Sequence, residues 1–266
     1  MTFARTDSHE ARHLAESFGA DAARYDRARP SYPDALVRRI VAASPGLDVL
    51  DVGIGTGIAA RQFQAAGCRI VGVEVDARMA DLARRGGFEV GVAPFEEWDP
   101  AGRSFDAVVA GQAWHWIDPA KGAAQAAAVL RPGGLLALFW NVFEPPADLA
   151  HSFSEVYRRT LPDSPFSGGT SRGAEAYSPI LTKAVDGIGT ARDFAEPEQW
   201  RFEWEWLYNR DEWLDFVPTS GGHSQLAPGK LDELLAGIGA AIDAVGGSFT
   251  MHYTTVAVVS GHAGQG

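Results

Sequence analysis

The residues with the clearest chemical potential form a glycine-rich loop, Gly53-x-Gly55-x-Gly57, between a predicted buried strand and a predicted helix. Glycines let a backbone approach a ligand closely, and the helix N-terminus presents unpaired N–H groups. The dinucleotide fingerprint has glycine or alanine one position later, where this chain has Ile58. Because a branched side chain there would crowd a pyrophosphate, a nucleotide-like ligand without one fits better. By itself, the loop could also be only a tight turn.

Two acidic positions extend this candidate site. Glu74 lies at the end of the next predicted strand, where a carboxylate can accept hydrogen bonds from both ribose hydroxyls. Pro94, Phe95 and Glu96 follow the third predicted strand, so an apolar pair could sandwich an adenine while Glu96 receives its amino group. The alternatives are a solvated acid at the strand end and a plain surface loop.

A regular alternation of strands and helices positions these residues. After a helix at 34–43, we predict strands at 47–52, 69–75, 89–92, 105–110 and 135–140, and helices at 57–66, 77–85 and 119–130. A turn at 131–134 precedes the last of these strands. This alternation is typical of an α/β fold, a Rossmann-like, doubly wound and mostly parallel sheet.

The alternation stops after Asn141. Residues 144–198 are rich in Pro, Gly and Ser and predict an irregular, partly helical insertion, followed by a strand at 201–208, a helix at 230–245 and a strand at 249–259. We therefore predict one domain with seven strands, the last antiparallel, and a helical cap. Its parts are an N-terminal lid (1–33), a ligand-binding core (34–141), an insertion or cap (142–200) and C-terminal strands and helix (201–266).

Composition narrows the class of protein. The net charge is −11 over 266 residues and basic residues form only short pairs, so nucleic acid is not an expected partner. No apolar run is long enough to span a membrane, the N-terminus has no secretory pattern, and Cys68 is a single cysteine. These features favour a cytoplasmic protein. His9 and His13 have helical spacing but no convincing acidic partners, so we predict no metal.

The ordered motifs resemble those of the class I methyltransferases that use S-adenosyl-L-methionine (SAM). Residues 50–57 resemble the first motif of that family, and 71–74 with Asp76 resemble the second. Residues 105–109 and 130–134 resemble later motifs, so the resemblance spans 47–141 in the family's order. The flanks, including Tyr25, Arg29-Pro30 and Tyr32-Pro33, are similar to a trans-aconitate methyltransferase-like group.

The resemblance implies roles for individual residues. The cofactor would contact Tyr25, Arg29, Asp51, Gly53, Ile54, Gly55, Glu74, Val75, Met79, Pro94, Phe95, Glu96 and Gln112. Among these, Asp51 would organise the loop, Gln112 would line the methyl-donor end, and Tyr25 and Arg29 would close over the cofactor. The loop at 93–97 lacks the small–acid pair common in the family, so which acid meets adenine stays open.

On the acceptor side, SAM brings its own sulfonium leaving group, so the protein must mainly align the reactants and exclude water. A hydroxyl or protonated amine also needs a base, and His115 and His223 are the candidates. Either histidine could instead be structural, His115 packed between aromatic rings and His223 in an exposed loop. The residues expected at the acceptor pocket are Trp114, His115, Trp116, Trp140, Asn141 and His223.

The expected function is therefore methyl transfer from SAM to an oxygen, nitrogen or carboxylate of a small, apolar or aromatic acceptor, by a monomer or homodimer. Two alternatives share parts of the pattern. A nicotinamide-dependent oxidoreductase has the same glycine loop and strand-end acid, although Ile58 and the later motifs speak against it. A non-catalytic SAM-binding protein would show every cofactor motif without turnover.

Overall fold

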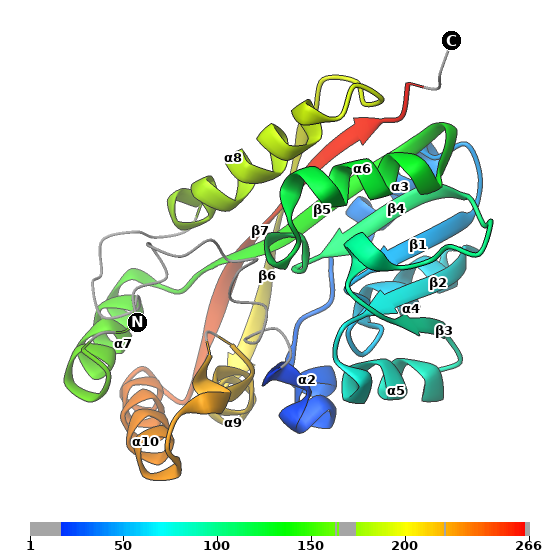
Figure 1. The fold of residues 1–266 in the computed structure, drawn as a ribbon. Helices are drawn as coiled ribbons and strands as arrows, with labels where there is room; N and C mark the ends of the chain where they lie inside the picture. Colours follow the sequence, from blue (N-terminus) through cyan, green and yellow to red (C-terminus); the bar gives the residue numbers. More distant parts are fainter. Residues whose placement is uncertain (1–16, 163, 165–173, 221, 264–266) are drawn as a thin grey trace.

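The structure, a computed structural model, describes residues 17–162, 164, 174–220 and 222–263. Its centre is a seven-stranded sheet with the order β3-β2-β1-β4-β5-β7-β6, shown in Figure 1. The strands are β1 (Asp48–Val52), β2 (Arg69–Glu74), β3 (Glu89–Val92), β4 (Phe105–Gly111), β5 (Leu130–Glu144), β6 (Glu198–Asn209) and β7 (Ser248–Gly261). Only β7 runs against the others, pairing antiparallel with both β5 and β6. The predicted fold class and the antiparallel last strand are confirmed.

Helices and short 3-10 turns connect these strands. The helices are α2 (Ala22–Ala28), α3 (Asp34–Ala43), α4 (Ile58–Ala65), α5 (Ala77–Arg85), α6 (Pro119–Val129), α7 (Ala147–Thr160), α8 (Ala174–Thr190), α9 (Arg210–Phe216) and α10 (Pro228–Ala244). The 3-10 turns are η2 (Ser17–Asp21), η3 (Phe95–Glu97), η4 (Trp114–Trp116), η6 (Val217–Thr219) and η7 (His223–Gln225). From 47 to 130 these elements lie within a few residues of the predicted ranges.

Alternating side chains divide the sheet into two buried faces. Along β5, Leu136, Leu138 and Trp140 join one core cluster with residues of α6 and α8, whereas Leu135, Ala137 and Phe139 join another with residues of α3 and α4. Successive strand residues point to opposite faces, so a strand covered on both sides is apolar at every position. This explains why the predicted strands read as continuous apolar runs.

A separate core lies at the end of the sheet where β6 finishes and β7 begins. Figure 1 shows α7, α9 and α10 gathered there, away from the helices that cover the sheet. Phe153, Trp213 and Phe249 belong to this cluster, and the rings of Phe153 and Trp213 are stacked with centroids 6.2 Å apart. We call this cluster the cap core. The tryptophan-rich stretch after residue 200 therefore mainly serves packing, although Trp206 is 47% exposed.

Two sequence predictions about this region are corrected. The insertion, predicted to be irregular and partly helical, contains the long helices α7 and α8, and α8 packs beside α6 on the sheet. The predicted turn at 131–134 lies inside β5, because Gly133 takes a positive φ of 74° and the β4–β5 register shifts between Phe105 and Ala107. A glycine that adopts this conformation lets the strand absorb the irregularity.

Two kinds of feature are absent from the described ranges. There, no helix combines the length and apolar character needed to cross a bilayer. Within the same ranges, no group of three or more His, Cys, Asp or Glu side chains is arranged to hold a metal ion. His9 and His13 lie outside the described residues.

Asn141 takes part in a buried polar chain that ties the last strands together. The Trp204 indole donates to Thr255 Oγ1 at 2.8 Å, and Thr255 Oγ1 donates to Asn141 Oδ1 at 2.7 Å. Asn141 Nδ2 in turn donates to the Ser31 carbonyl at 3.1 Å. Because Asn141 and Thr255 are buried, each group depends on this chain for its hydrogen bonds. The chain joins β5, β6 and β7 to the N-terminal segment.

We expect Thr255→Val to destabilise the fold by about 2 kcal/mol, since it keeps the shape but leaves buried polar groups of Asn141 and Trp204 unpaired. Urea denaturation of the variant and the wild type measures this difference. Thr254→Val, the same substitution at the adjacent, less buried position of β7, is the matched control. Equal losses in the two variants would contradict a stabilising role for the chain.

Candidate active site

A pocket lies where β1, β2 and β4 end, with about 690 Å³ of empty space including its open mouth. Its walls come from the glycine loop, the end of β2, the loop after β3, the loop after β4 and the N-terminal segment. The lining residues are Phe18, Tyr25, Val52, Gly53, Gly55, Val73, Glu74, Val75, Met79, Ala93, Phe95, Glu96, Gly111, Gln112, Ala113, Trp116 and Ile117. Ligands of open α/β sheets bind at this carboxyl edge.

Close approach of two loops requires glycine at position 53. Gly53 has a φ of +69°, and a Cβ placed there would lie 2.4 Å from Cβ of Ala113. The N–H groups of Gly53 and Ile54 donate to the Val73 carbonyl at 2.8 and 3.1 Å, which holds the loop against β2. The floor of the pocket is therefore bare backbone in a fixed position.

The carboxylate of Glu74 fixes the same loop from the other side. It accepts hydrogen bonds from the backbone N–H groups of Gly55 (2.9 Å), Val75 (2.9 Å) and Asp76 (3.0 Å). Burial raises the pKa of Glu74, while these hydrogen bonds favour its charged form. Two carboxylate oxygens can accept about four hydrogen bonds, so capacity remains for a ligand hydroxyl.

Asp51 is a buried acid without a cation beside it. Its side chain lies at the end of β1, is 1% exposed, and has an Oδ2 atom with no hydrogen-bond partner. Burial, followed by repulsion from Glu74, raises the pKa of Asp51 to about 8. A ligand that brought a positive charge to this point would relieve both effects. Asp51 does not line the pocket itself and lies behind the glycine loop.

The end of the pocket near β3 is apolar. Val75, Met79 and Phe95 line it, in agreement with their predicted place beside a flat ring. Glu96 also lines the pocket, and its Oε1 accepts a hydrogen bond from the Asp118 N–H at 2.9 Å. Pro94 is outside the lining and caps the start of η3.

Ile54 is a core residue rather than a pocket residue. It is 4% exposed, and a Cβ at Gly72 would lie 2.5 Å from its Cδ1 atom. Any contact of Ile54 with the cofactor would therefore be through its backbone, and that contact stays a prediction. The side chain points into the cluster formed with α4 and α5, where it anchors the loop.

The N-terminal segment supplies two aromatic walls. Tyr25 lines the pocket as predicted, and Phe18, which sequence reasoning did not single out as a site residue, lies with its ring centroid 5.8 Å from that of Tyr25. Arg29 is outside the lining, with its guanidinium 4.9 Å from the centroid of the Tyr25 ring. The predicted closure over the pocket is thus direct for Tyr25 and indirect for Arg29.

The loop after β4 carries backbone strain at the pocket. Gln112 has a φ of +55°, uncommon for a residue with a side chain, and its N–H donates to the Phe139 carbonyl at 2.8 Å. Burial raises the pKa of Tyr177 from α8, and the nearby Gln112 side chain partly offsets this rise. No local pattern marked Tyr177, because α8 comes from the insertion and reaches the loop only in the folded chain.

His115 is held by a neighbouring tryptophan. The Trp140 indole N–H donates to His115 Nδ1 at 3.2 Å, and the ring of Trp116 lies 4.7 Å away between centroids. Burial, and then the positive charge of Arg29, lowers the pKa of His115 to about 4. With Nδ1 accepting, the neutral ring carries its proton on Nε2 and presents a donor. His115 is not a lining residue of the pocket, and a base role stays a prediction.

His223 is buried rather than exposed. Its Nε2 lies 3.1 Å from the Tyr157 hydroxyl, and its Nδ1 is hydrogen-bonded to the Ser220 carbonyl. It is 3% exposed, and burial lowers its pKa. The loop that carries it is thereby joined to α7, and a catalytic role for His223 stays a prediction.

Three residues predicted to wall an acceptor pocket are corrected. Trp114 and Trp140 are 2% and 0% exposed and belong to the core between the sheet, α6 and α8. Asn141 is 3% exposed and serves the polar chain described above. Trp140 and Asn141 lie in the sheet layers because β5 continues past them to Glu144, whereas Trp114 packs into the core from η4. Trp116, in contrast, lines the pocket at the glycine loop, and its contact with an acceptor stays a prediction.

Comparison with known proteins supports a methyltransferase. A model of the methyltransferase domain matches residues 50–138. An uncharacterized methyltransferase of Mycobacterium tuberculosis is 36% identical over 196 residues, which cover 69% of this chain and 79% of the relative. A relative from Saccharomyces cerevisiae, provisionally named an S-adenosylmethionine-dependent methyltransferase, is 28% identical over 150 residues, covering 52% of this chain and 51% of the relative.

The fold has close counterparts among solved structures. A proposed type II methyltransferase from Anaeromyxobacter dehalogenans superposes with a TM-score of 0.62 at 23% identity, covering 87% of this chain and 97% of that one. A Rossmann-like sheet with a glycine-loop pocket at its carboxyl edge is the arrangement in which open α/β proteins bind nucleotide-like ligands. The chain belongs to the class I SAM-dependent methyltransferases. This membership decides between a methyltransferase and the oxidoreductase that the glycine loop alone left open.

His115 is expected to stay neutral, with its proton on Nε2, from about pH 8 down to about pH 5. The reason is that its lowered pKa of about 4 lies below that range and Trp140 occupies Nδ1. Nitrogen-15 NMR of the imidazole rings reports both the charge and the tautomer. In Trp140→Phe the tautomer preference should be lost. An imidazolium signal for His115 at pH 6 would contradict this description.

Asp51 is expected to make the ligand-free protein less stable as the pH rises. Its pKa of about 8 in the folded chain lies above the unfolded value of about 3.9, so only the folded state keeps the proton between these values. The contribution of protonated Asp51 to the free energy of unfolding is therefore fully present below about pH 4 and is lost as the pH rises to about 8.

Asp51→Asn keeps the group neutral at every pH. The free energy of unfolding of this variant, relative to that of the wild type, should increase from about pH 5 to about pH 8 in urea denaturation. The exposed Asp232→Asn on α10 is the control. A difference that does not change with pH would show that the buried carboxyl is not the source.

Proposed function

We propose that this protein transfers the methyl group of SAM to an oxygen, nitrogen or carboxylate of a small-molecule acceptor in the cytoplasm. The observation that carries the proposal is the pocket at the carboxyl edge, where Glu74, the bare loop at Gly53 and the aromatic wall of Tyr25 converge. Membership of the methyltransferase family supports methyl transfer as the reaction, and the pocket is the proposed place where the reaction occurs. The small-molecule acceptor is supported by the acidic net charge of −11, which disfavours a nucleic acid.

The residues present fit SAM. A bare backbone floor at Gly53 leaves room for the methionine part, and Glu74 keeps acceptor capacity for ribose hydroxyls. Val75 and Phe95 offer apolar surface to adenine. Asp51, which is buried at the end of β1 and does not line the pocket, would organise the loop rather than contact the ligand. When bound, SAM supplies an activated methyl group on a sulfonium, which needs no further electrophilic activation.

The chain's own residues would then orient the reactants and exclude water. Phe18 and Tyr25 cover the pocket from the N-terminal side, and Trp116 extends this apolar wall, with ring centroids of Phe18 and Trp116 6.2 Å apart. Gln112 lines the pocket, and its backbone N–H, which donates to the Phe139 carbonyl at 2.8 Å, would hold the loop after β4 against β5. Removing water and holding the acceptor in line are the main contributions that such a displacement requires.

The neutral histidines favour an acceptor that arrives already nucleophilic. His115 offers a donor in its observed tautomer, and His223 is engaged at both ring nitrogens. A carboxylate acceptor or a neutral amine needs no base, whereas a hydroxyl does. The likeness of the N-terminal flank to a trans-aconitate methyltransferase-like group agrees with a small acceptor. We also propose the division of the domain into an N-terminal lid (1–33), a SAM-binding core (34–141), a cap (142–200) and a C-terminal part (201–266).

Binding of S-adenosyl-L-homocysteine, the product of the cofactor, tests the proposal by isothermal titration calorimetry. The wild type should bind, and Glu74→Gln should bind at least about tenfold more weakly, because a charged hydrogen-bond acceptor is lost both to the ligand and to the Gly55 N–H. Glu97→Gln, an exposed acid on η3, is the control and should leave the affinity unchanged. A folded wild type without binding would overturn the proposal.

The acceptor can be sought with the same protein. Incubation with isotopically labelled SAM and fractions of a metabolite extract, followed by mass spectrometry, should show a product heavier than its precursor by one labelled methyl group in place of a hydrogen. Binding without any such product across the fractions would favour a non-catalytic SAM-binding protein.

A further inference from the structure

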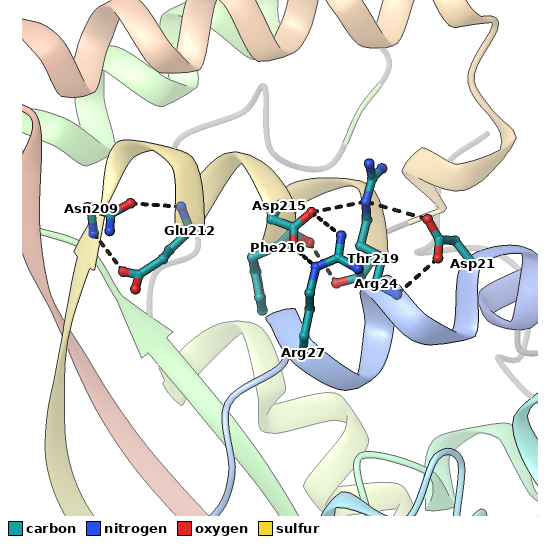
Figure 2. A network of polar contacts seen from close by, with 8 residues as sticks. All are labelled: Asp21, Arg24, Arg27, Asn209, Glu212, Asp215, Phe216 and Thr219. Carbon is teal, nitrogen blue, oxygen red and sulfur yellow. Dashed lines mark hydrogen bonds and ion pairs between the residues drawn. The ribbon is translucent and has the colours of Figure 1, made fainter. Parts of the chain in front are cut away.

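The N-terminal helix α2 is held to α9 by charged side chains, shown in Figure 2. Arg27 forms a two-pronged contact with Asp215, in which Nε donates to Oδ2 at 2.7 Å and Nη2 donates to Oδ1 at 2.8 Å. Arg24 Nε lies 3.1 Å from the same Oδ1 atom. One carboxylate on α9 thus joins two arginines of α2, from a position 188 residues away along the chain.

These contacts add to weaker attachments of α2, among them a hydrogen bond of 2.8 Å from Arg61 of α4 to Asp26 and the packing of Ala28 against the cap core. None of its residues is buried, so it lacks the apolar face that usually fixes a short helix. Asp21 caps its first turn by accepting the Arg24 N–H at 2.9 Å, which stabilises the helix but does not attach it to the protein. The attachment therefore depends on side chains that reach other elements.

The carboxylate itself sits on a fixed support. Helix α9 begins with a reciprocal cap, in which Asn209 accepts from the Glu212 N–H and Glu212 accepts from the Asn209 N–H. Trp213 and Phe216 of α9 are buried in the cap core. Asp215 is 26% exposed, less than Arg27 at 56%, so the acid is the better ordered partner.

Arg29, which follows α2 directly, makes a second set of contacts with α9 and with η6. The guanidinium of Arg29 lies 4.9 Å from the Tyr25 ring and 5.0 Å from the Phe216 ring, measured to the centroids. Arg29 Nη2 also donates to the Thr219 carbonyl at 2.6 Å. Tyr25 is therefore connected to α9 through Arg29 on one side and lines the cofactor pocket on the other.

We propose that Asp215 is a positioning residue that clamps α2 onto α9 and so holds Tyr25 and Phe18 in the wall of the cofactor pocket. The inference rests on the proposed function, since it takes this pocket to be the site of SAM. Asp215 touches neither pocket nor ligand and acts only through Arg24 and Arg27. The clamp thus connects α2, which precedes the sheet core in the sequence, to α9, which follows it.

The clamp sets how much of the time the pocket is closed. A ligand that contacts Tyr25 binds the closed form, and its apparent affinity falls in proportion to the closed fraction. Bidentate arginine–carboxylate pairs are the stronger kind of surface ion pair, and two pairs share this acid. We therefore expect loss of the Asp215 charge to speed ligand release by about three- to tenfold at low salt. Salt screens exposed pairs, so the effect should shrink at high ionic strength.

The experiment compares Asp215→Asn, Asp215→Glu and wild type by stopped-flow dissociation of S-adenosyl-L-homocysteine at low and high salt. Hydrogen exchange of the α2 amides in ligand-free protein gives a readout that needs no ligand. Asp243→Asn is the matched control, because it removes an exposed acid from the cap that pairs with Arg210 and not with α2. The melting temperature of each variant reports general destabilisation.

The clamp predicts faster release and faster α2 exchange in Asp215→Asn, an unchanged melting temperature, and recovery in Asp215→Glu. Arg27→Gln should reproduce the effect and add little to Asp215→Asn, as expected for two partners in one contact. Asp215→Asn behaving like Asp243→Asn in both assays would overturn the clamp. If wild type binds no S-adenosyl-L-homocysteine, the proposed function fails, and α2 exchange alone decides whether the clamp exists.

Discussion

The site depends on one buried carboxylate. Glu74 accepts the N–H groups of Gly55, Val75 and Asp76, which belong to the glycine loop and to the turn that enters α5. It thereby joins the ends of two neighbouring parallel strands, whose backbone groups would otherwise be unpaired at the sheet edge. The position of the pocket floor, the start of α5 and the environment of Asp51 all follow from this contact. The same side chain lines the pocket, so one carboxylate both supports the loop and offers acceptor atoms to the pocket.

The cover of the pocket is built differently from its floor. The floor is fixed by strands and backbone hydrogen bonds, whereas the cover consists of α2 and the aromatic residues around it. Because α2 buries none of its residues, contacts with α9 and the chain after it hold it in place. A cover with few apolar contacts is suited to opening at low energetic cost, as exchange of a cofactor for its product requires.

The acceptor side is marked by polar groups from distant segments. Gln112 adopts a strained backbone conformation after β4, and Tyr177 from α8 meets its side chain. His115 and His223 lie further out, and burial lowers the pKa of both. Neutral histidines that are already hydrogen-bonded define shape and donors more than basicity.

The sequence by itself determined the sheet core and the cofactor loop, because strand periodicity, the glycines at 53, 55 and 57, and Glu74 are local signals. It did not determine that Asn141 and Trp140 point into the sheet layers, since the length of β5 depends on its pairing with β7. Nor did it reveal Tyr177 or Asp215, which reach the site region from remote segments. Such contacts are decided only by tertiary packing, because no short-range pattern encodes which distant side chain meets a given loop.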